Sequence, residues 1–195
     1  MNTPENQRFG LAGRRVLLRP LREGDLADFL AYRGDPEVCR YQGFGPIDEA
    51  RARSFIREQH HFDIGRRGVW MQIGIENRHS RRLIGDCAVR FAAEEPRIAE
   101  IGCTLHPAHQ CQGYAREALS LLIGHLFRHQ RIHKVIAVSD ARNRPSIRMI
   151  IALGFTHEAT LRRHYFDPKD QGWHDEWVFG LLIDDAPALP YLHPA

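Results

Sequence analysis

Several signals of common protein classes are missing from this chain. It contains no run of 18 or more apolar residues and its first seven residues are polar, so the sequence predicts neither a membrane span nor a secretory signal. None of its four cysteines belongs to a C-x-x-C pair. We therefore expect reduced thiols and a cytoplasmic protein without a membrane partner.

Excess charge and lysine are also scarce. The 27 Lys and Arg residues outnumber the 24 Asp and Glu residues by three, and only Lys134 and Lys169 are lysines. So small an excess does not predict a nucleic-acid partner. Hydrophobic residues make up 43% and charged residues 26% of the 195 positions, which is typical of one globular domain. We expect an arm at 1–13, a domain at 14–183 and a tail at 184–195.

Three ligand-binding motifs are absent from the sequence as well. It has no G-x-x-x-x-G-K-[ST] phosphate loop and no G-x-G-x-x-G dinucleotide fingerprint. His125 and His129 have the spacing of two zinc ligands, but Leu126 stands where a zincin helix carries its glutamate. The sequence therefore predicts no metal site.

Hydrophobic periodicity predicts an α/β (α+β) domain built on one mixed sheet. Apolar runs predict strands at 15–19, 69–75, 82–91, 98–105, 135–138, 155–160 and 177–183. Helical spacing predicts helices at 25–33, 48–60, 114–130 and 143–153, and Asp25 and Asp48 would cap the first two. Short turns join the three strands between 69 and 105, so we expect an antiparallel meander there.

The segment 110–115, with the sequence QCQGYA, lies between a predicted strand and an amphipathic helix. The first N–H groups of a helix have no intrahelical acceptor, and the helix dipole places partial positive charge there. Gly113 and Ala115 are small enough for a pyrophosphate to approach the backbone, and Arg116 adds charge. An ordinary strand–turn–helix with one glycine would explain the same residues, so the loop alone leaves both interpretations open.

Five separated stretches carry a family signature. They are Gln110-x-x-Gly113-x-Ala115, the run 100–107 (EIGCTLHP), the blocks 143–146 (NRPS) and 153–155 (LGF), and the opening 16–21 (VLLRPL) followed by Asp25. In this order they resemble the GCN5-related N-acetyltransferase (GNAT) superfamily, and within it the RimJ/RimL-like branch of ribosomal-protein alanine acetyltransferases. The resemblance extends from about residue 14 to about residue 183.

The resemblance implies a single GNAT-like domain, with a mixed sheet of about six or seven strands and helices on both faces. In such a fold the strands at 98–105 and 135–138 would splay apart, and the gap would receive the pantetheine arm of acetyl-CoA. The residues that the resemblance assigns to acetyl-CoA are Cys103, Thr104, Leu105, Gln110, Cys111, Gln112, Gly113, Tyr114, Ala115, Arg116, Asn143 and Ser146.

Acetyl transfer to an amine requires an unprotonated amine held close to the thioester carbonyl. An α-amine has a pKa of about 7.7–8.0, so it needs little help to lose its proton near neutral pH. The pKa of a lysine-like amine lies about 3 units above neutral pH, so this amine needs a base or desolvation to become unprotonated. Glu100 is the candidate general base, acting directly or through water. A solvent-facing carboxylate on a strand would explain the same residue.

The proton for the departing thiolate needs a different donor. Many GNAT enzymes use a tyrosine as the general acid at a position that is Ile150 here, so the RimL-like branch points to Ser146 as the substitute. A polar contact at a helix start would also explain Ser146. Tyr114 and Tyr165 are reserve candidates, and Asn143 either orients the coenzyme or caps its helix.

The acceptor pocket is expected to lie between the first two helices, the segment 41–44 and the stretch 165–177. Trp70 or Trp173 would wall this pocket, unless these side chains pack in the core.

These features predict an N-acetyltransferase that moves an acetyl group from acetyl-CoA to a primary amine by direct attack in a ternary complex. The acceptor is either a protein N-terminus, as the branch implies, or a small-molecule amine. A catalytically inactive CoA-binding regulatory module is the alternative, and a nucleotide-binding protein is disfavoured by the missing phosphate-loop lysine. Domains of this kind often pair through exposed strands, so the resemblance also points to a homodimer.

Overall fold

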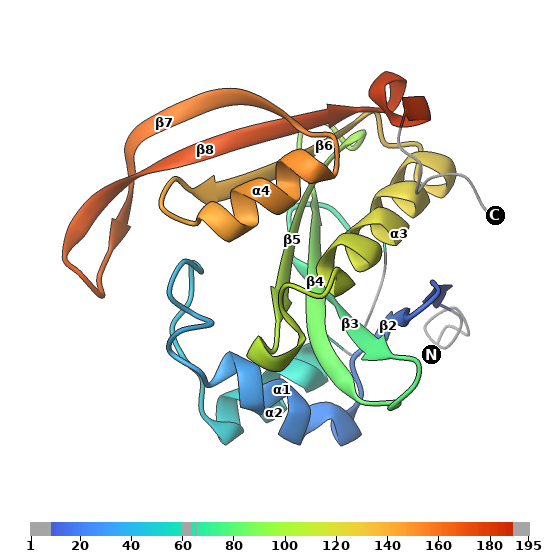
Figure 1. The fold of residues 1–195 in the computed structure, drawn as a ribbon, viewed down its shortest axis with the longest axis vertical. Helices are drawn as coiled ribbons and strands as arrows, with labels where there is room; N and C mark the ends of the chain where they lie inside the picture. Colours follow the sequence, from blue (N-terminus) through green and yellow to red (C-terminus); the bar gives the residue numbers. More distant parts are fainter. Residues whose placement is uncertain (1–8, 60–63, 65, 189–195) are drawn as a thin grey trace.

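The computed structural model describes residues 9–59, 64 and 66–188, which form one eight-stranded sheet covered by helices (Figure 1). The strands lie in the order β1-β2-β3-β4-β5-β6-β8-β7. Their bounds are Leu11–Ala12 (β1), Val16–Pro20 (β2), Met71–Asn77 (β3), Leu83–Phe91 (β4), Ile98–Leu105 (β5), Lys134–Asp140 (β6), Thr156–Asp167 (β7) and Gly172–Leu182 (β8). The predicted mixed sheet is confirmed, and the strand beyond the predicted six or seven is the two-residue β1, which pairs with β2 in a segment where the sequence predicts an arm.

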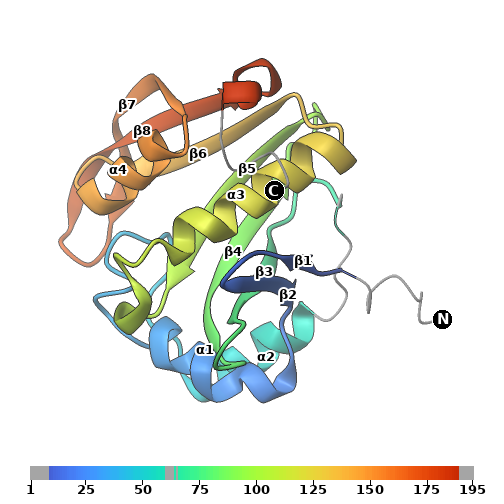
Figure 2. The same cartoon turned by 45° about the vertical axis from the view of Figure 1, so that its right-hand side comes forward.

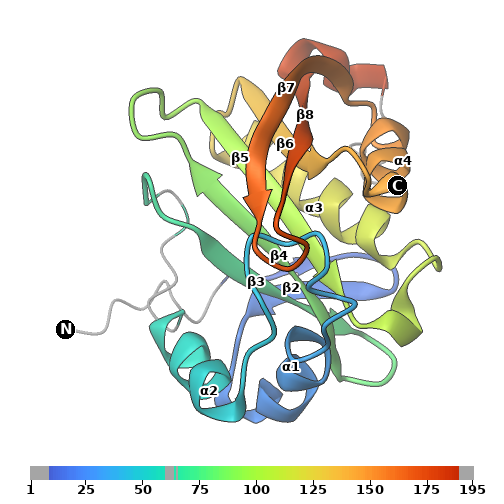
Figure 3. The same ribbon diagram turned by 90° about the vertical axis from the view of Figure 1, so that its left-hand side faces the viewer.

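Helices cover both faces of this sheet. Figure 2 shows α3 and α4 over one face, and Figure 3 shows α1 and α2 against the other. The bounds of the helices in the described residues are Leu26–Arg33 (α1), Glu49–Glu58 (α2), Tyr114–His129 (α3) and Arg144–Ala152 (α4), with 3₁₀ turns at Glu23–Asp25 (η2), Pro107–His109 (η3) and Ile183–Ala188 (η4). Across the described residues, no helix has both the length and the hydropathy that a membrane crossing requires.

Most of the core lies between α3 and the sheet. Ala118, Leu119, Leu122, Ile123 and Leu126 of α3 are buried at helical spacing and pack against the inward side chains of the strands. A second, smaller cluster joins α1 and α2 to the opposite face; its buried members are Leu21, Phe29, Tyr32, Ala52, Ile56 and Leu83.

A buried ion pair fixes α1 on the central strand β4. The carboxylate of Asp86 accepts hydrogen bonds from Tyr32 Oη at 2.7 Å and from Arg33 Nε and Nη2 at 3.1 and 2.5 Å. Removing one partner of such a pair typically costs about 3–5 kcal/mol, because the other charge is left buried alone. The chain that leaves α1 at Gly34 therefore starts from a defined place on this face of the sheet.

The two predicted caps have different outcomes. Asp48 caps α2, since its side chain accepts the N–H of Arg51 at 2.8 Å, as predicted. The prediction for Asp25 is wrong: its carboxylate accepts from Arg19 Nη1 and Nη2 at 2.7 and 2.8 Å and from the N–H of Arg22. A buried guanidinium needs a paired carboxylate more than a helix start needs a cap, because an unpaired buried charge is far more costly.

The sheet opens between β5 and β6, the one parallel pair among the named strands of the described residues. In the described residues the two strands pair only where Ile98–Glu100 face Lys134–Ile136. The remaining residues of β5 stay paired with β4, and those of β6 stay paired with β8. We call the space between Ile101–Leu105 and Ala137–Asp140 the β5–β6 gap. It is the splay that the family resemblance implies.

The last two strands extend well beyond their predicted bounds. The stretch 161–176, expected to be partly a pocket loop, belongs mostly to the long hairpin of β7 and β8. Exposed residues on both faces of β7 and a register shift between Leu161 and Tyr165 hide the alternation by which strands are identified. The hairpin arches so that its tip reaches the segment between α1 and α2 (Figures 1 and 3).

Candidate functional site

The loop that the sequence predicts to bind an anion contains two residues with left-handed backbone. Cys111 and Gly113 have left-handed φ values of 57° and 81°, and Gly113 stands directly before the first residue of α3. In the described residues no side chain caps the N–H groups at the beginning of α3, and the positive end of the helix dipole lies behind them, an arrangement that suits an anion.

Side-chain amides hold the loop in shape. Gln110 Nε2 donates to the carbonyl of Leu105 at 3.0 Å, and Gln112 Nε2 donates to the carbonyl of Ala108 at 2.7 Å. The first bond ties the loop to the end of β5. Gln110 and Gln112 thus act as braces of the loop in this structure, whereas the sequence predicts them only as ligand contacts.

The same loop is also held by Arg15, which stands just before β2, and by Glu117 of α3. The sequence alone predicts a role for neither residue. The guanidinium of Arg15 donates to the carbonyl of Gln112 at 2.9 Å and to Glu117 Oε2 at 2.8 Å, and it lies 4.7 Å from the ring centroid of Tyr114. Glu117 also accepts the backbone N–H groups of Arg15 and Val16. Arg15 and Glu117 are 102 positions apart, so no local pattern predicts their contact. The one available hint is that Glu117 is an acidic residue in the first turn of a helix.

The splayed half of β5 presents its side chains to two different faces. Ile101 is buried with α3 and Cys103 packs against the same cluster, so these residues face the α3 side. Thr104 faces the α1 side, where its hydroxyl accepts a hydrogen bond from Gln42 Nε2 at 3.4 Å. Strand alternation therefore sends Glu100, Gly102 and Thr104 to the α1 face.

Glu100 lies at the closed end of the β5–β6 gap, opposite Ile136 of β6. Its carboxylate is half-buried and forms an ion pair with Arg90 Nη2 at 2.5 Å. The guanidinium of Arg90 in turn lies over the ring of Trp70, with 4.8 Å to the centroid. Glu100 is thus held at one position on the α1 face, rather than extended freely into solvent.

Asn143 and Ser146 lie just beyond the open end of the gap. The N–H of Asn143 donates to the carbonyl of Asp140, the last residue of β6, and its side chain caps α4 by accepting the N–H of Ser146 at 3.3 Å. Ile150, which replaces the family tyrosine, is buried in the core. Ser146 is therefore the hydroxyl on the first turn of α4, while Glu100 stands at the opposite end of the gap.

The reserve candidate Tyr114 points elsewhere. Its hydroxyl accepts a hydrogen bond from Asn77 Nδ2 at 3.2 Å, at the end of β3. Since β4 separates β3 from β5, this hydroxyl lies two strands away from the β5–β6 gap. The structure does not bring Tyr114 to the place where a thiolate would leave.

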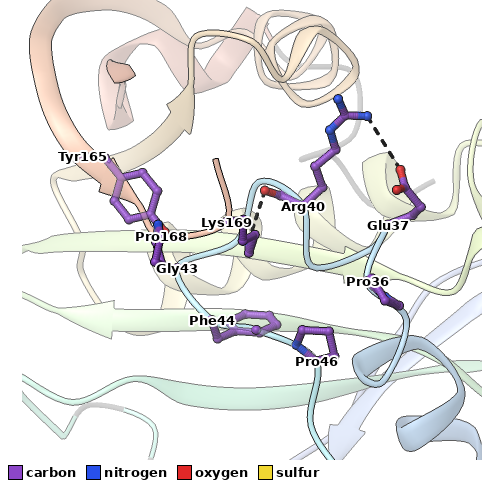
Figure 4. A pocket seen from close by; sticks show the side chains of 10 residues that line it. Pro36, Glu37, Arg40, Gly43, Phe44, Pro46, Tyr165, Pro168 and Lys169 are labelled. Carbon is purple, nitrogen blue, oxygen red and sulfur yellow. Dashed lines mark hydrogen bonds and ion pairs between the residues drawn. The ribbon is translucent and has the colours of Figure 1, made fainter. Parts of the chain in front are cut away.

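A cavity of about 480 Å³ lies between the segment 36–46 and the tip of the β7–β8 hairpin (Figure 4). Its walls include Phe44 from one side and Tyr165 and Pro168 from the other. The structure thus brings together 41–44 and 165–177, two of the segments that the sequence assigns to an acceptor pocket, whereas in the described residues neither α1 nor α2 lines this cavity. The predicted tryptophans are elsewhere: in the described part of the chain neither Trp70 nor Trp173 lines this cavity, and both are exposed, so neither is a core residue.

Lys169 fastens the hairpin tip to the segment 36–46. Its ammonium donates to the carbonyl oxygens of Cys39, Arg40 and Gln42 at 2.5, 3.2 and 3.4 Å. The same segment carries Gln42, which bonds to Thr104 on β5. One lysine therefore connects the cavity wall to the strand beside the gap.

A guanidinium occupies the centre of the acidic cluster at the other side of the hairpin tip. Asp167, Asp170 and His174 have ligand atoms within 4.8 Å of one another, an arrangement that could suit a metal ion. Arg142 donates to Asp167 and Asp170 at 3.3 and 2.7 Å and to Asp140 at 2.6 Å, and its Nη1 lies 2.8 Å from His174 Nε2. Hydrogen bonds from His174 and Arg142 lower the pKa of Asp170 to about 2. The cluster as it stands is an ion-pair network that fixes the hairpin to the end of β6.

The brace between Glu117 and Arg15 gives a pH-dependent prediction. Burial alone would raise the pKa of Glu117, but hydrogen bonds and the ion pair with Arg15 lower it below its ordinary value. The stabilisation is therefore complete above the unfolded pKa and is lost as pH falls through the folded pKa. Glu117→Gln should lower the free energy of unfolding by about 1–3 kcal/mol at neutral pH, and the difference should shrink in acid.

Urea unfolding of the wild-type protein and of Glu117→Gln, from neutral pH into acid, measures this difference in the free energy of unfolding. Glu49→Gln is the matched control, because Glu49 is an exposed partner of Arg53 and should change stability by about 0.5 kcal/mol or less. A Glu117→Gln difference that stays constant down to the acid limit would contradict the assigned role of the carboxylate charge.

Comparison with known proteins identifies the family. Residues 15–156 match the family described as acetyltransferase (GNAT) domain. The uncharacterized N-acetyltransferase p20 of Bacillus licheniformis is 30% identical over 170 residues, which cover 86% of this chain and 93% of that protein. The uncharacterized N-acetyltransferase YoaA of Bacillus subtilis is 30% identical over 154 residues, covering 78% and 85%.

A more distant structure shares the fold. Mycobacterium smegmatis RimJ in complex with CoA-disulfide aligns with a TM-score of 0.72 at 20% identity, covering 90% of this chain and 86% of that one. The family match extends over more than two thirds of the chain and includes the loop, the β5–β6 gap and the start of α4. The chain therefore belongs to the acetyltransferase (GNAT) domain family and is an N-acetyltransferase enzyme.

Proposed function

We propose that this enzyme transfers an acetyl group from acetyl-CoA to a primary amine by direct attack in a ternary complex. One observation carries the proposal: an uncapped helix start stands beside a strand whose outer edge, within the described residues, is unpaired from Ile101 to Leu105. Helix N–H groups suit a pyrophosphate, and an unpaired strand edge suits the amide groups of a pantetheine arm. Both parts lie on one side of the sheet end, joined by the bond from Gln110 to Leu105.

The coenzyme contacts follow from this arrangement. The backbone of Gly113, Tyr114 and Ala115 would bind the pyrophosphate, with Cys111, Gln112 and Arg116 beside it. The strand residues Cys103, Thr104 and Leu105 would bind the pantetheine arm. Asn143 and Ser146 would contact the arm from the start of α4.

The reaction requires one bond to form and one to break. When bound, acetyl-CoA supplies an activated acyl group whose thioester carbon accepts the amine nitrogen. Glu100, directly or through a water, would take the proton that the attacking amine must lose, and its pairing with Arg90 fixes the carboxylate on the α1 face. Ser146, as a hydroxyl at the start of α4, would return a proton to the departing sulfur. The acceptor would reach Glu100 from the cavity on the same face.

The finer assignments rest on the resemblance. The RimJ structure and the motif order support a RimJ/RimL-like branch, which would make protein N-termini candidate acceptors. The four cysteines are free thiols, which suits a cytoplasmic enzyme. The fixed carboxylate of Glu100 beside the gap supports catalysis over the inactive CoA-binding module that the sequence left open.

Gly113 offers a test of coenzyme binding. A side chain here meets a left-handed φ, and its Cβ would lie 3.2 Å from Arg15 Nη2, so any substitution carries strain. Gly113→Ala introduces that strain without charge, about 1 kcal/mol, whereas Gly113→Glu also places a negative charge in the anion site. We expect Gly113→Glu to weaken acetyl-CoA binding by about 100-fold or more relative to Gly113→Ala, as read by calorimetry. Equal affinities of the two variants, both folded by circular dichroism, would sink the assignment.

Glu100→Gln tests the proposed base. The amide keeps the size of the side chain but cannot take the proton, so kcat should fall by about 10²–10⁴ while the affinity for acetyl-CoA stays unchanged. The matched control is Glu95→Gln in the turn between β4 and β5, where an exposed carboxylate pairs with Arg97. Steady-state release of free thiol measures both. Wild-type kcat in Glu100→Gln would remove the carboxylate from the mechanism.

A further inference from the structure

The cavity has the size and position of an acceptor site. Its volume of about 480 Å³ is in the range of small-molecule pockets. The segment 36–46 that forms one wall also reaches β5 through the bond between Gln42 and Thr104. The opposite wall, the hairpin tip, is tied to the end of β6 through Arg142. The cavity is therefore bounded by two elements, one tied by hydrogen bonds to β5 and the other to the end of β6.

The walls favour an apolar or aromatic body. Pro36, Phe44 and Pro46 line one side, and Tyr165 and Pro168 line the other (Figure 4). Rings and prolines bury ligand carbon without leaving polar groups unpaired, and aromatic faces add specific ring contacts. A ligand that is polar along its whole length would gain little here.

Positive charge lies at the side formed by residues 36–40. The guanidinium of Arg40 is exposed and stands 3.7 Å from Glu37, the one acidic residue of the lining. The ammonium of Lys169 donates its hydrogen bonds to backbone carbonyls, but its positive charge still lies in the cavity wall. With two cations against one carboxylate, this side attracts an anionic group and repels a second ammonium.

Negative charge gathers beyond Tyr165. Partial burial and the carboxylates of Asp167, Glu176 and Asp140 raise the pKa of Tyr165. Arg142 already pairs with Asp140 and Asp167, whereas the carboxylate of Glu176 lies 2.6 Å from Nδ1 of the exposed His164 ring. Glu176 stands opposite Asp140 in the β6–β8 pair. The carboxylates beyond Tyr165 therefore favour the passage of an ammonium group along this side of the cavity.

We propose that the acceptor is a small monoamine that carries an apolar or aromatic body and a carboxylate remote from the amine, as a dipeptide does. It enters with the amine leading past Tyr165 toward Glu100, lays its body along Phe44, and leaves its carboxylate beside Arg40. A polyamine would set additional ammonium groups against Arg40 and Lys169. This assignment rests on the proposed acetyl transfer and names its substrate class.

Three acceptors test the assignment with the wild-type enzyme and acetyl-CoA. Phenylalanyl-glycine and its C-terminal amide share the amine and the aromatic body and differ only in the carboxylate, and spermidine is the polyamine. We expect kcat/KM for the free acid to exceed that for the amide by about three- to tenfold, as an exposed charge contact allows, and spermidine to be slowest. The preference for the acid should shrink as salt is added.

Two variants locate the preference. Arg40→Gln should make the acid and the amide equivalent, and Arg40→Glu should favour the amide. The matched control is Arg57→Gln, an exposed arginine of α2 outside the cavity lining, which should keep the wild-type ratio. Calorimetric binding of the acid and the amide in the presence of CoA measures the same preference without turnover.

The outcomes separate this assignment from the activity on which it rests. Equal values for the acid and the amide in the wild type, or fastest transfer to spermidine, would overturn the acceptor class and leave acetyl transfer standing. An unchanged preference in Arg40→Glu would overturn the role of Arg40. Absence of transfer to all three amines, with acetyl-CoA bound, would contradict the proposed activity itself.

Discussion

The site depends on the divergence of two strands that start as a parallel pair. β5 stays paired with β4 over seven residues, and β6 stays paired with β8 over seven, while β5 and β6 share three pairs in the described residues. Each strand follows its antiparallel neighbour, so the two halves of the twisted sheet separate beyond Glu100. The separation leaves the edge of β5 open, places the start of α3 at one side of the opening and places the start of α4 at the other. The loop, the candidate base and the cavity all take their positions from it.

Local sequence predicts the parts of this arrangement that local physics determines. The strand at 98–105 and the start of α3 at Tyr114 match the prediction residue for residue, because a clear apolar pattern ends at Pro107 and Gly113 breaks the backbone before the next pattern begins. Asn143 caps α4 as its side chain suggests. The gap itself was predictable only from resemblance to a family, because hydrophobic periodicity does not indicate where two parallel strands stop pairing.

The remaining features depend on contacts between residues far apart in the chain. Arg15 braces Glu117 across 102 positions, and Lys169 reaches Cys39 across 130, so neither has a local signature. Asp25 satisfies the predicted cap composition and yet pairs with Arg19, because the fold buries that arginine. The sequence predicts strands at 155–160 and 177–183 but not how far the hairpin extends, since both faces of β7 are exposed. Contacts of this kind join segments that are distant in the chain, so local sequence does not reveal them.

Backbone hydrogen exchange of residues 101–105, with and without acetyl-CoA, tests the central claim most directly. If the coenzyme arm pairs with the open edge of β5, the amides that face the gap should exchange more slowly by about tenfold or more when acetyl-CoA is bound, as should those at 113–115. The amides of β4, paired on both sides, serve as the reference. Saturating acetyl-CoA that protects other regions but leaves 101–105 unchanged would contradict the account.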